Sequence, residues 1–213
     1  WDHGTRGHTQ WYLFAVSGAE AGRTYRFNII NFCKAQSLYR QGMRPLVYST
    51  RAAAEHGEGW RRGGERILYF ENGVVKRSGG RGEHSTLSFV WRAGELDEEW
   101  VYFAYCYPYT YTELCRDLGV LEADPSRAPL LRRKLLCTTI AGNACEHLLI
   151  TDYAAPDEAI AARPVVALSA RVHPGESNSS FMMRGILYFL TGPSEEARLL
   201  RERLLFLIVP MLN

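Results

Sequence analysis

The residues of this 213-residue chain that are best suited to chemistry lie in a short polar turn, His173-Pro174-Gly175-Glu176. Imidazole and carboxylate groups both bind zinc, and catalytic zinc commonly takes three such protein ligands and keeps one further position open. His173 and Glu176 are three positions apart across a Pro-Gly bend, so their side chains can converge on one ion. The spacing is therefore that of half a zinc site.

An interpretation without a metal fits the same residues. A single His-x-x-Glu pair in a chain with six histidines is an easy coincidence. His173 can simply end a strand, while Glu176 and Ser177 begin a helix, where the helix dipole favours a carboxylate. The spacing alone leaves both interpretations open.

Two apolar segments flank the turn and must position it. Val165–Val172 is short and rich in β-branched residues, and prolines bound it on both sides, which is typical of a buried strand. The apolar run Ser180–Leu190 predicts a buried helix. The polar turn would then lie at the carboxyl end of a central strand, which is where open α/β sheets bind their ligands.

The segments around this strand and helix predict an α/β domain. Lys134–Ile140 and Glu146–Asp152 read as a hairpin joined by a Gly142-Asn143 turn. Ser194 can cap a second helix that opens with two glutamates and closes with arginines, which matches the helix dipole. Leu204–Leu212 follows as a strand, so strand, helices and strand form a right-handed crossover between parallel neighbours.

The first half of the chain, residues 1–106, has a different pattern. Short strand-like segments alternate with turn residues, and no convincing helix separates them, which predicts an antiparallel β-sandwich. The segments are Thr9–Ser17, Gly22–Phe32, Met43–Ser49, Arg66–Phe70, His84–Trp91 and Trp100–Cys106, and the turns are at Gly18, Asn72-Gly73, Gly79-Gly80 and Gly94. Tyr25, Phe27 and Ile29 alternate with polar residues and are expected to face a core. Nothing in this half suggests chemistry, so we expect it to position or recognise a partner.

Tyr107-Pro-Tyr-Thr-Tyr111 lies where the two patterns meet, at the start of the second domain, residues 107–213. Its aromatic residues either pack between domains or bring a tyrosine hydroxyl to the rim of a site. Thr110 or Thr112 is expected to cap a helix that stops at Gly119.

Composition narrows the class of protein. An apolar fraction of 46% supports real cores, and a net charge of +2 argues against nucleic acid as the main partner. No apolar run reaches the length needed to span a membrane. The five cysteines are Cys33, Cys106, Cys115, Cys137 and Cys145, without C-x-x-C spacing, so we expect reduced thiols in a cytosolic compartment. Cys137 and Cys145 flank the predicted turn and either approach each other or serve as core thiols.

Several segments together resemble a known family. Arg171–Ser180, with Leu207–Asn213 downstream, is similar to the zinc carboxypeptidases of the funnelin type, and specifically to the cytosolic carboxypeptidase subfamily. Trp1–Trp11 and Tyr102–Tyr111 resemble the domain that precedes the peptidase in that subfamily. The resemblance spans essentially the whole chain. It implies a piece of a larger protein, with a β-sandwich followed by the first part of an α/β catalytic domain.

The resemblance also implies roles for residues. His173 and Glu176 would bind zinc, while a third ligand, the general base and a substrate-clamping arginine are expected beyond Asn213. No catalytic residue is then expected within the chain, which by itself should bind zinc weakly and hydrolyse nothing. Digestive relatives carry an arginine between the two ligands, whereas Gly175 stands here.

The implied reaction is zinc-assisted hydrolysis of the last peptide bond of a chain, in the cytoplasm, with removal of glutamates from tubulin or similar acidic tails. Five arginines either steer such a tail or form an ordinary solvated face: Arg61, Arg62, Arg66, Arg132 and Arg133. Two alternatives stay open. One is a zinc amidohydrolase of the aspartoacylase type, and the other is a non-catalytic, partner-binding protein with a vestigial peptidase fold.

Overall fold

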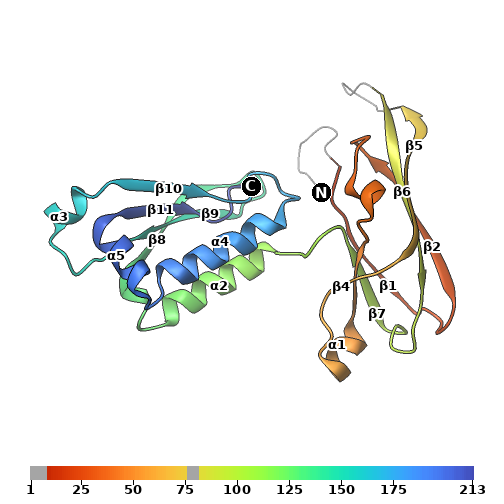
Figure 1. Cartoon of the computed structure of the whole chain (residues 1–213), viewed down its shortest axis with the longest axis horizontal. Coiled ribbons are helices and arrows are strands. Elements are labelled where there is room, and N and C mark those ends of the chain that lie inside the picture. Colours follow the sequence, from red (N-terminus) through yellow and green to blue (C-terminus); the bar gives the residue numbers. More distant parts are fainter. Residues whose placement is uncertain (1–8, 76–81) are drawn as a thin grey trace. The chain divides into compact units, whose positions relative to one another are not determined.

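A computed structural model describes residues 9–75 and 82–213 of the chain. It divides into two compact units, Trp1–Tyr107 and Pro108–Asn213 (Figure 1). The sequence places the boundary one residue earlier, after position 106. Most of the Trp1–Trp11 segment and the expected Gly79-Gly80 turn lie outside the described residues. Within the described ranges, none of the helices has the length and apolarity needed to cross a membrane.

The first unit contains two antiparallel sheets. One sheet has the order β1 (Leu13–Ser17), β7 (Trp100–Ala104), β3 (Leu46–Ser49), β4 (Arg61–Arg62). The other has the order β2 (Thr24–Phe32), β6 (Glu83–Arg92), β5 (Glu65–Val75). Every pairing in both sheets is antiparallel.

The two sheets share one core that is rich in aromatic side chains. The ring of Phe103 on β7 lies 5.0 Å from that of Phe27 on β2 and 5.8 Å from that of Phe89 on β6. Because strands of both sheets supply these rings, the sheets pack face to face. Tyr25, Phe27 and Ile29 all pack against this core, which confirms the alternation expected for β2.

The expectation of no helix in the first unit was wrong. Helix α1 covers Thr50–His56, and the 3-10 helix η1 covers Leu38–Gln41. The Ser49 hydroxyl accepts a hydrogen bond from the backbone N–H of Ala52 and caps α1, and Gly57 ends it at φ 69°. A run of alanines between these two caps is the signal that the strand-based interpretation passed over.

Asn72-Gly73 does not separate two strands as expected, because it lies inside β5. The pairing of β5 with β6 shifts register between Glu71 and Val75, and Gly73 has a φ of 75°. The Asn72 side-chain amide donates to the carbonyl of Ile30, at 2.7 Å, and so ties the irregular segment to β2. Gly73 therefore adopts its left-handed conformation at a β-bulge. Bulges and turns favour the same residue types, which is why the sequence suggested a turn here.

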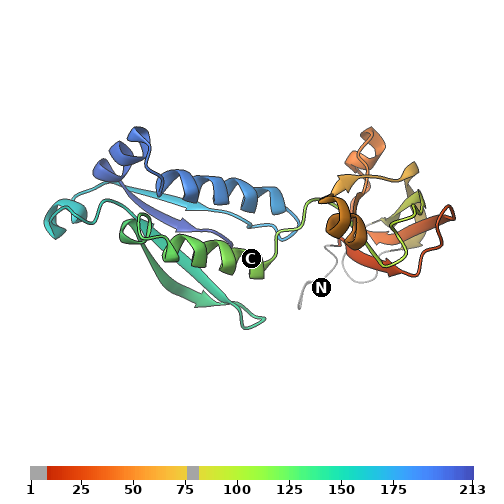
Figure 2. The ribbon, with the colours of Figure 1, turned by 90° about the horizontal axis from the view of Figure 1, so that it is seen from below.

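The second unit is built on a mixed sheet with the order β10 (Val165–Ser169), β11 (Leu205–Val209), β9 (Ala144–Ile150), β8 (Leu131–Thr138). β8 and β9 form the predicted hairpin, and β10 and β11 are parallel, as predicted. Helices α2 (Tyr111–Ala123) and α4 (Ser177–Leu190) lie side by side along one face (Figures 1 and 2). The connections hold η2 (Ala128–Leu130), α3 (Asp157–Ala161) and α5 (Glu195–Arg203).

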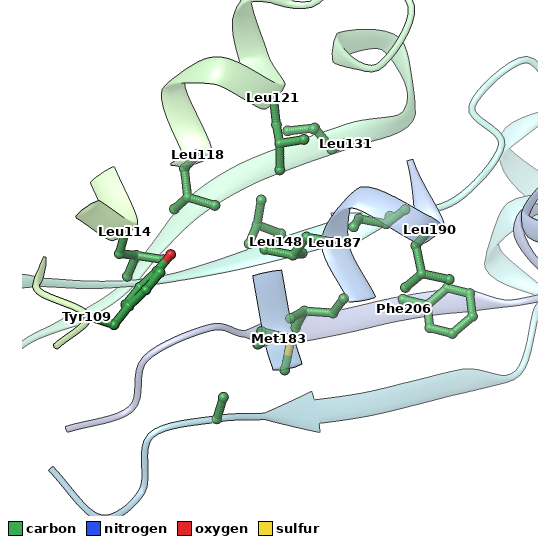
Figure 3. Packing of buried hydrophobic residues seen from close by; sticks show 13 residues of the cluster. Tyr109, Leu114, Leu118, Leu121, Leu131, Leu148, Met183, Leu187, Leu190 and Phe206 are labelled. Atoms are coloured by element: carbon green, nitrogen blue, oxygen red, sulfur yellow. The ribbon is translucent and has the colours of Figure 1, made fainter. Parts of the chain in front are cut away.

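The two long helices bury aliphatic side chains against this sheet (Figure 3). The helices supply Leu114, Leu118 and Leu121 from α2 and Met183, Leu187 and Leu190 from α4. These side chains recur every three or four residues, which is the spacing of one helix face. Full burial of a large aliphatic side chain stabilises by about 1.5–3 kcal/mol, so this face fixes α4 on the sheet.

Three expectations for this unit need correction. α2 continues past Gly119 to Ala123, because Leu121 is fully buried and its burial outweighs the roughly 1 kcal/mol cost of a glycine inside a helix. β10 is an edge strand of the described sheet, and Val165 is 58% exposed. α4 is buried on one face only, since Met182 on the other face is 68% exposed.

Candidate functional site

The predicted ligands lie where two parallel strands end. His173 and Glu176 belong to the loop that connects the carboxyl end of β10 to α4. The segment after β11 runs alongside this loop, because the backbone N–H of Asn213 donates to the carbonyl of Arg171 at 3.2 Å. The Asn213 side-chain amide donates to the carbonyl of Val172 at 3.3 Å. The turn therefore occupies the carboxyl edge of the sheet, as the sequence predicts.

The turn itself is closed by a hydrogen bond from the backbone N–H of Glu176 to the carbonyl of His173, at 3.1 Å. Both side chains are exposed, and neither has a hydrogen bond or an ion pair with any other described residue. Glu176 is the N-cap residue of α4, but its carboxylate makes no capping hydrogen bond. The helix-end interpretation therefore fits its position, while its carboxylate oxygens remain available to a ligand.

Arg171 holds the loop that carries both residues. Its backbone has a φ of 57°, a conformation that costs a residue other than glycine about 1–3 kcal/mol and that persists only where its surroundings impose it. Its guanidinium donates to the carbonyls of Pro174, at 2.8 Å, and Tyr109, at 3.0 Å. It also donates to the hydroxyl of Ser180 at 3.0 Å. Sequence reasoning did not assign Arg171 a role.

The serines that open α4 complete the support. The Ser179 hydroxyl accepts a hydrogen bond from the backbone N–H of Arg171, at 3.0 Å, and donates to the carbonyl of Glu176, at 2.8 Å. One side chain thus links Arg171, near the start of the loop, to Glu176, its last residue. Together with the guanidinium of Arg171, it fixes the backbone before and after His173.

Tyr109, from the aromatic segment at the start of the unit, is buried in the aliphatic core. Its hydroxyl donates to a carboxylate oxygen of Asp117 at 2.6 Å, and its backbone carbonyl accepts from Arg171. Burial, followed by the hydrogen bond to Asp117, raises the pKa of the Tyr109 hydroxyl above its usual value. This tyrosine supports the loop through its backbone, and its hydroxyl is engaged elsewhere.

The donor atoms of the turn suit a zinc ion. An imidazole nitrogen and a carboxylate oxygen are both ordinary zinc ligands, and in the described part of the chain neither group is used for a hydrogen bond or an ion pair. Residues 9–75 and 82–213 contain no group of three histidine, cysteine, aspartate or glutamate side chains arranged to hold a metal. His173 and Glu176 therefore fit two positions of a zinc site and do not complete one.

Of the five arginines considered for steering, the two in the second unit, Arg132 and Arg133, have partners nearby. The guanidinium of Arg133 lies 3.0 Å from the carboxylate of Glu122 and 2.5 Å from that of Glu146. Arg132 lies over the ring of Tyr153, 4.3 Å from its centroid. Two neighbouring carboxylates offset the charge of Arg133, which favours a structural role for it over long-range steering.

Comparison with known proteins gives relatives over nearly the whole chain. The chain is 44% identical over 210 residues to cytosolic carboxypeptidase 3 of Bos taurus, and this alignment covers 98% of the chain and 20% of that protein. It is 44% identical over 215 residues to cytosolic carboxypeptidase 2 of Danio rerio, covering 98% and 28% of the two chains. No family model matches the chain.

Solved structures share the fold. A metallo-carboxypeptidase from Burkholderia cenocepacia aligns with a TM-score of 0.68 at 22% identity, over 98% of this chain and 48% of that one. A metallo-carboxypeptidase from Pseudomonas aeruginosa, in complex with (2-guanidinoethylmercapto)succinic acid, aligns with a TM-score of 0.66 at 23% identity, over 98% and 47%. The described architecture therefore occurs in metallo-carboxypeptidases.

Proposed function

The chain is homologous to a segment of the cytosolic carboxypeptidases, and from this relationship we propose that the whole protein is a zinc metallocarboxypeptidase in which His173 and Glu176 are metal ligands. The chain spans about 20% of the length of the first relative, so this activity is proposed for the longer protein. The observation that carries the proposal is the pair of exposed side chains, His173 and Glu176, at the carboxyl edge of the sheet, without a hydrogen bond or ion pair to another described residue.

The residues of this chain would act on the metal by binding and orientation. The His173 imidazole and the Glu176 carboxylate would hold the ion, and the carboxylate would offset part of its charge. Bound zinc would supply Lewis-acid chemistry for hydrolysis of a peptide bond. Arg171 and Ser179 would keep the two ligands in register, because they fix the backbone on both sides of the turn.

We further propose that the substrates are protein tails from which C-terminal residues are removed. The names of the relatives support carboxypeptidase activity in the cytosol. A preference for glutamate in acidic tails, with tubulin as a partner, extends the resemblance described above. In this proposal the first unit acts as a β-sandwich that positions or recognises the substrate.

The test uses the full-length natural protein, loaded with zinc and incubated with a peptide that ends in several glutamates. Mass spectrometry should detect stepwise loss of C-terminal glutamate. The His173→Ala variant should release none, while the His56→Ala control, which changes an exposed histidine of α1, should match the wild type.

Two results would contradict the proposal. Activity that survives in His173→Ala would remove His173 from the metal site. A wild-type protein that binds zinc but releases no residue from any peptide would favour the amidohydrolase or the non-catalytic alternative.

A further inference from the structure

The β8–β9 hairpin brings two cysteines opposite each other. Cys137 on β8 pairs directly with Cys145 on β9 in the antiparallel register. Opposite residues in such a pair have Cα atoms about 4.5–5.5 Å apart. A disulfide requires a Cα separation of about 4.4–6.8 Å. The backbone therefore already holds the two residues at a spacing that a disulfide accepts.

The two thiols differ in their access to solvent. Cys137 is exposed, whereas Cys145 is only 2% exposed, and its thiol donates to the carbonyl of Met211 at 3.6 Å. Burial, and then the adjacent Cys137 thiol, raise the pKa of the Cys145 thiol. An oxidant in solution thus reaches Cys137 first, and Cys145 lies beside it as the second thiol. Among the strand pairings that the structure describes, no other two cysteines face each other.

We propose that Cys137 and Cys145 are a redox modification site that forms a reversible disulfide when the protein meets a hydroperoxide. The Cys137 sulfur attacks the O–O bond of hydrogen peroxide, and this gives a sulfenic acid and one water. The Cys145 sulfur then attacks the Cys137 sulfur, the S–O bond breaks, and the leaving hydroxide takes the Cys145 proton as a second water. Two thiols lose two electrons, and the peroxide gains them.

The modification would reach the candidate site through the segment after β11. The disulfide removes the S–H donor that contacts the carbonyl of Met211. Met211 lies two positions before Asn213, whose backbone and side-chain amides hold the loop of Arg171 and Val172. In the structure Cys137 and Cys145 are both free thiols, which is the reduced state of the pair.

The experiment maps thiols in the folded protein after brief treatment with a small excess of hydrogen peroxide. The protein is unfolded in urea with iodoacetamide and digested with trypsin. Cys137 and Cys145 fall in the single tryptic peptide that begins at Leu135, so an internal disulfide leaves that peptide unalkylated and two hydrogens lighter. We expect two of the five thiols to disappear in this peptide and dithiothreitol to restore both.

Matched variants show whether the pairing is specific. Cys115→Ser, which changes a cysteine on α2, should still form the disulfide in the Leu135 peptide. Cys137→Ser should leave Cys145 fully alkylated after peroxide. The proposal is overturned if both cysteines of the wild type remain alkylated, or if Cys137 proceeds to a sulfinic acid without a bond to Cys145. It is also overturned if Cys137→Ser still loses two thiols.

Discussion

The two units of the chain use their sheets differently. In the first unit two antiparallel sheets cover each other, and rings such as Phe103 and Phe27 fill the space between them. In the second unit α2 and α4 cover one face of a single sheet, and the aliphatic core lies between the helices and the sheet (Figure 3). In the second unit the loop at the carboxyl edge of the sheet is held by polar contacts and is not covered by a second sheet. Its other side chains can therefore bind a ligand.

Polar side chains show the same contrast. In the first unit the hydroxyls of Tyr12 and Tyr39 satisfy each other at 2.8 Å inside the protein. In the second unit the side chains of Arg171 and Ser179 bond to the backbone of one loop. The side chains of His173 and Glu176 on that loop have no hydrogen bond or ion pair with another described residue. A rigidly held loop that carries uncommitted ligand side chains is the expected form of a binding site.

The largest expected effect comes from removing a buried side chain from one of the two cores and comparing the stability of the two units. Phe103→Ala should destabilise the first unit by about 3–5 kcal/mol, because Phe103 is fully buried among other rings. All five tryptophans belong to the first unit, so urea unfolding followed by tryptophan fluorescence reports on it selectively. Leu148→Ala, the matched change in the second core, should alter far-UV circular dichroism more than fluorescence. A fluorescence midpoint that Phe103→Ala leaves unchanged would show that this core is described wrongly.

The role assigned to Arg171 predicts the next largest effect. Arg171→Ala in the full-length protein should weaken zinc binding about 10–100-fold, the usual cost of losing a group that orients metal ligands. Competition with a chromophoric chelator measures this affinity. Arg198→Ala is the control, since Arg198 pairs with Glu195 and Glu202 on the exposed side of α5. Equal affinity in the two variants would reduce Arg171 to a structural residue.

Alkaline pH should affect the first unit through its buried tyrosines. Burial raises the pKa of both Tyr12 and Tyr39. Because the folded state holds these protons more tightly than the unfolded state, their contribution is complete below a pH of about 10 and declines as the pH rises further. The decline reaches up to about 1.4 kcal/mol per pH unit for each group. In fluorescence-detected unfolding, a Tyr12→Phe, Tyr39→Phe double variant should lose less stability than the wild type between pH 9 and 11, with most of the difference above pH 10. An unchanged pH dependence would show that these two tyrosines do not cause the alkaline loss of stability.

The smallest effect concerns the start of α2. The Thr110 hydroxyl accepts from the backbone N–H of Glu113 at 3.1 Å, and the Glu113 carboxylate accepts from the backbone N–H of Thr110 at 2.5 Å. Removing such a cap costs about 0.5–2 kcal/mol. Thr110→Ala should lower the free energy of unfolding of the second unit by this amount, measured by circular dichroism, and Thr110→Ser should restore most of it. Failure of serine to rescue would show that the hydroxyl is not the stabilising group.

Local signals account for the elements that the sequence predicts well. Helix α5 begins after Ser194, whose hydroxyl accepts from the backbone N–H of Ala197 at 3.2 Å, and the hairpin turn falls near Gly142, as expected. The order of strands in the first unit follows from no local signal. β1 pairs with β7 through Leu13 and Ala104, which lie at opposite ends of that unit's sequence. Pairings of this kind depend on the shared core, and residue periodicity does not specify them.

The candidate site divides in the same way. The sequence places His173 and Glu176 on a turn after a strand, because proline and glycine mark the bend and apolar runs mark the flanks. The residues that hold the turn come from separate segments, namely the carbonyl of Tyr109 and the amides of Asn213. An arginine that adopts a positive φ and bonds to distant backbone carbonyls has no sequence pattern of its own. Only the folded chain brings these groups together.

The most direct measurement compares Glu176→Gln with Glu196→Gln in the full-length protein, by zinc content, peptide hydrolysis and melting temperature. Glu196 is a matched control, since it is an exposed glutamate in the first turn of α5. If Glu176 is a metal ligand, Glu176→Gln should lose zinc and activity while its metal-free form melts as the metal-free wild type does, and Glu196→Gln should keep both. Full zinc and full turnover in Glu176→Gln, with only a loss of about 0.3–1 kcal/mol in stability, would make it a helix-end residue and contradict the metal site.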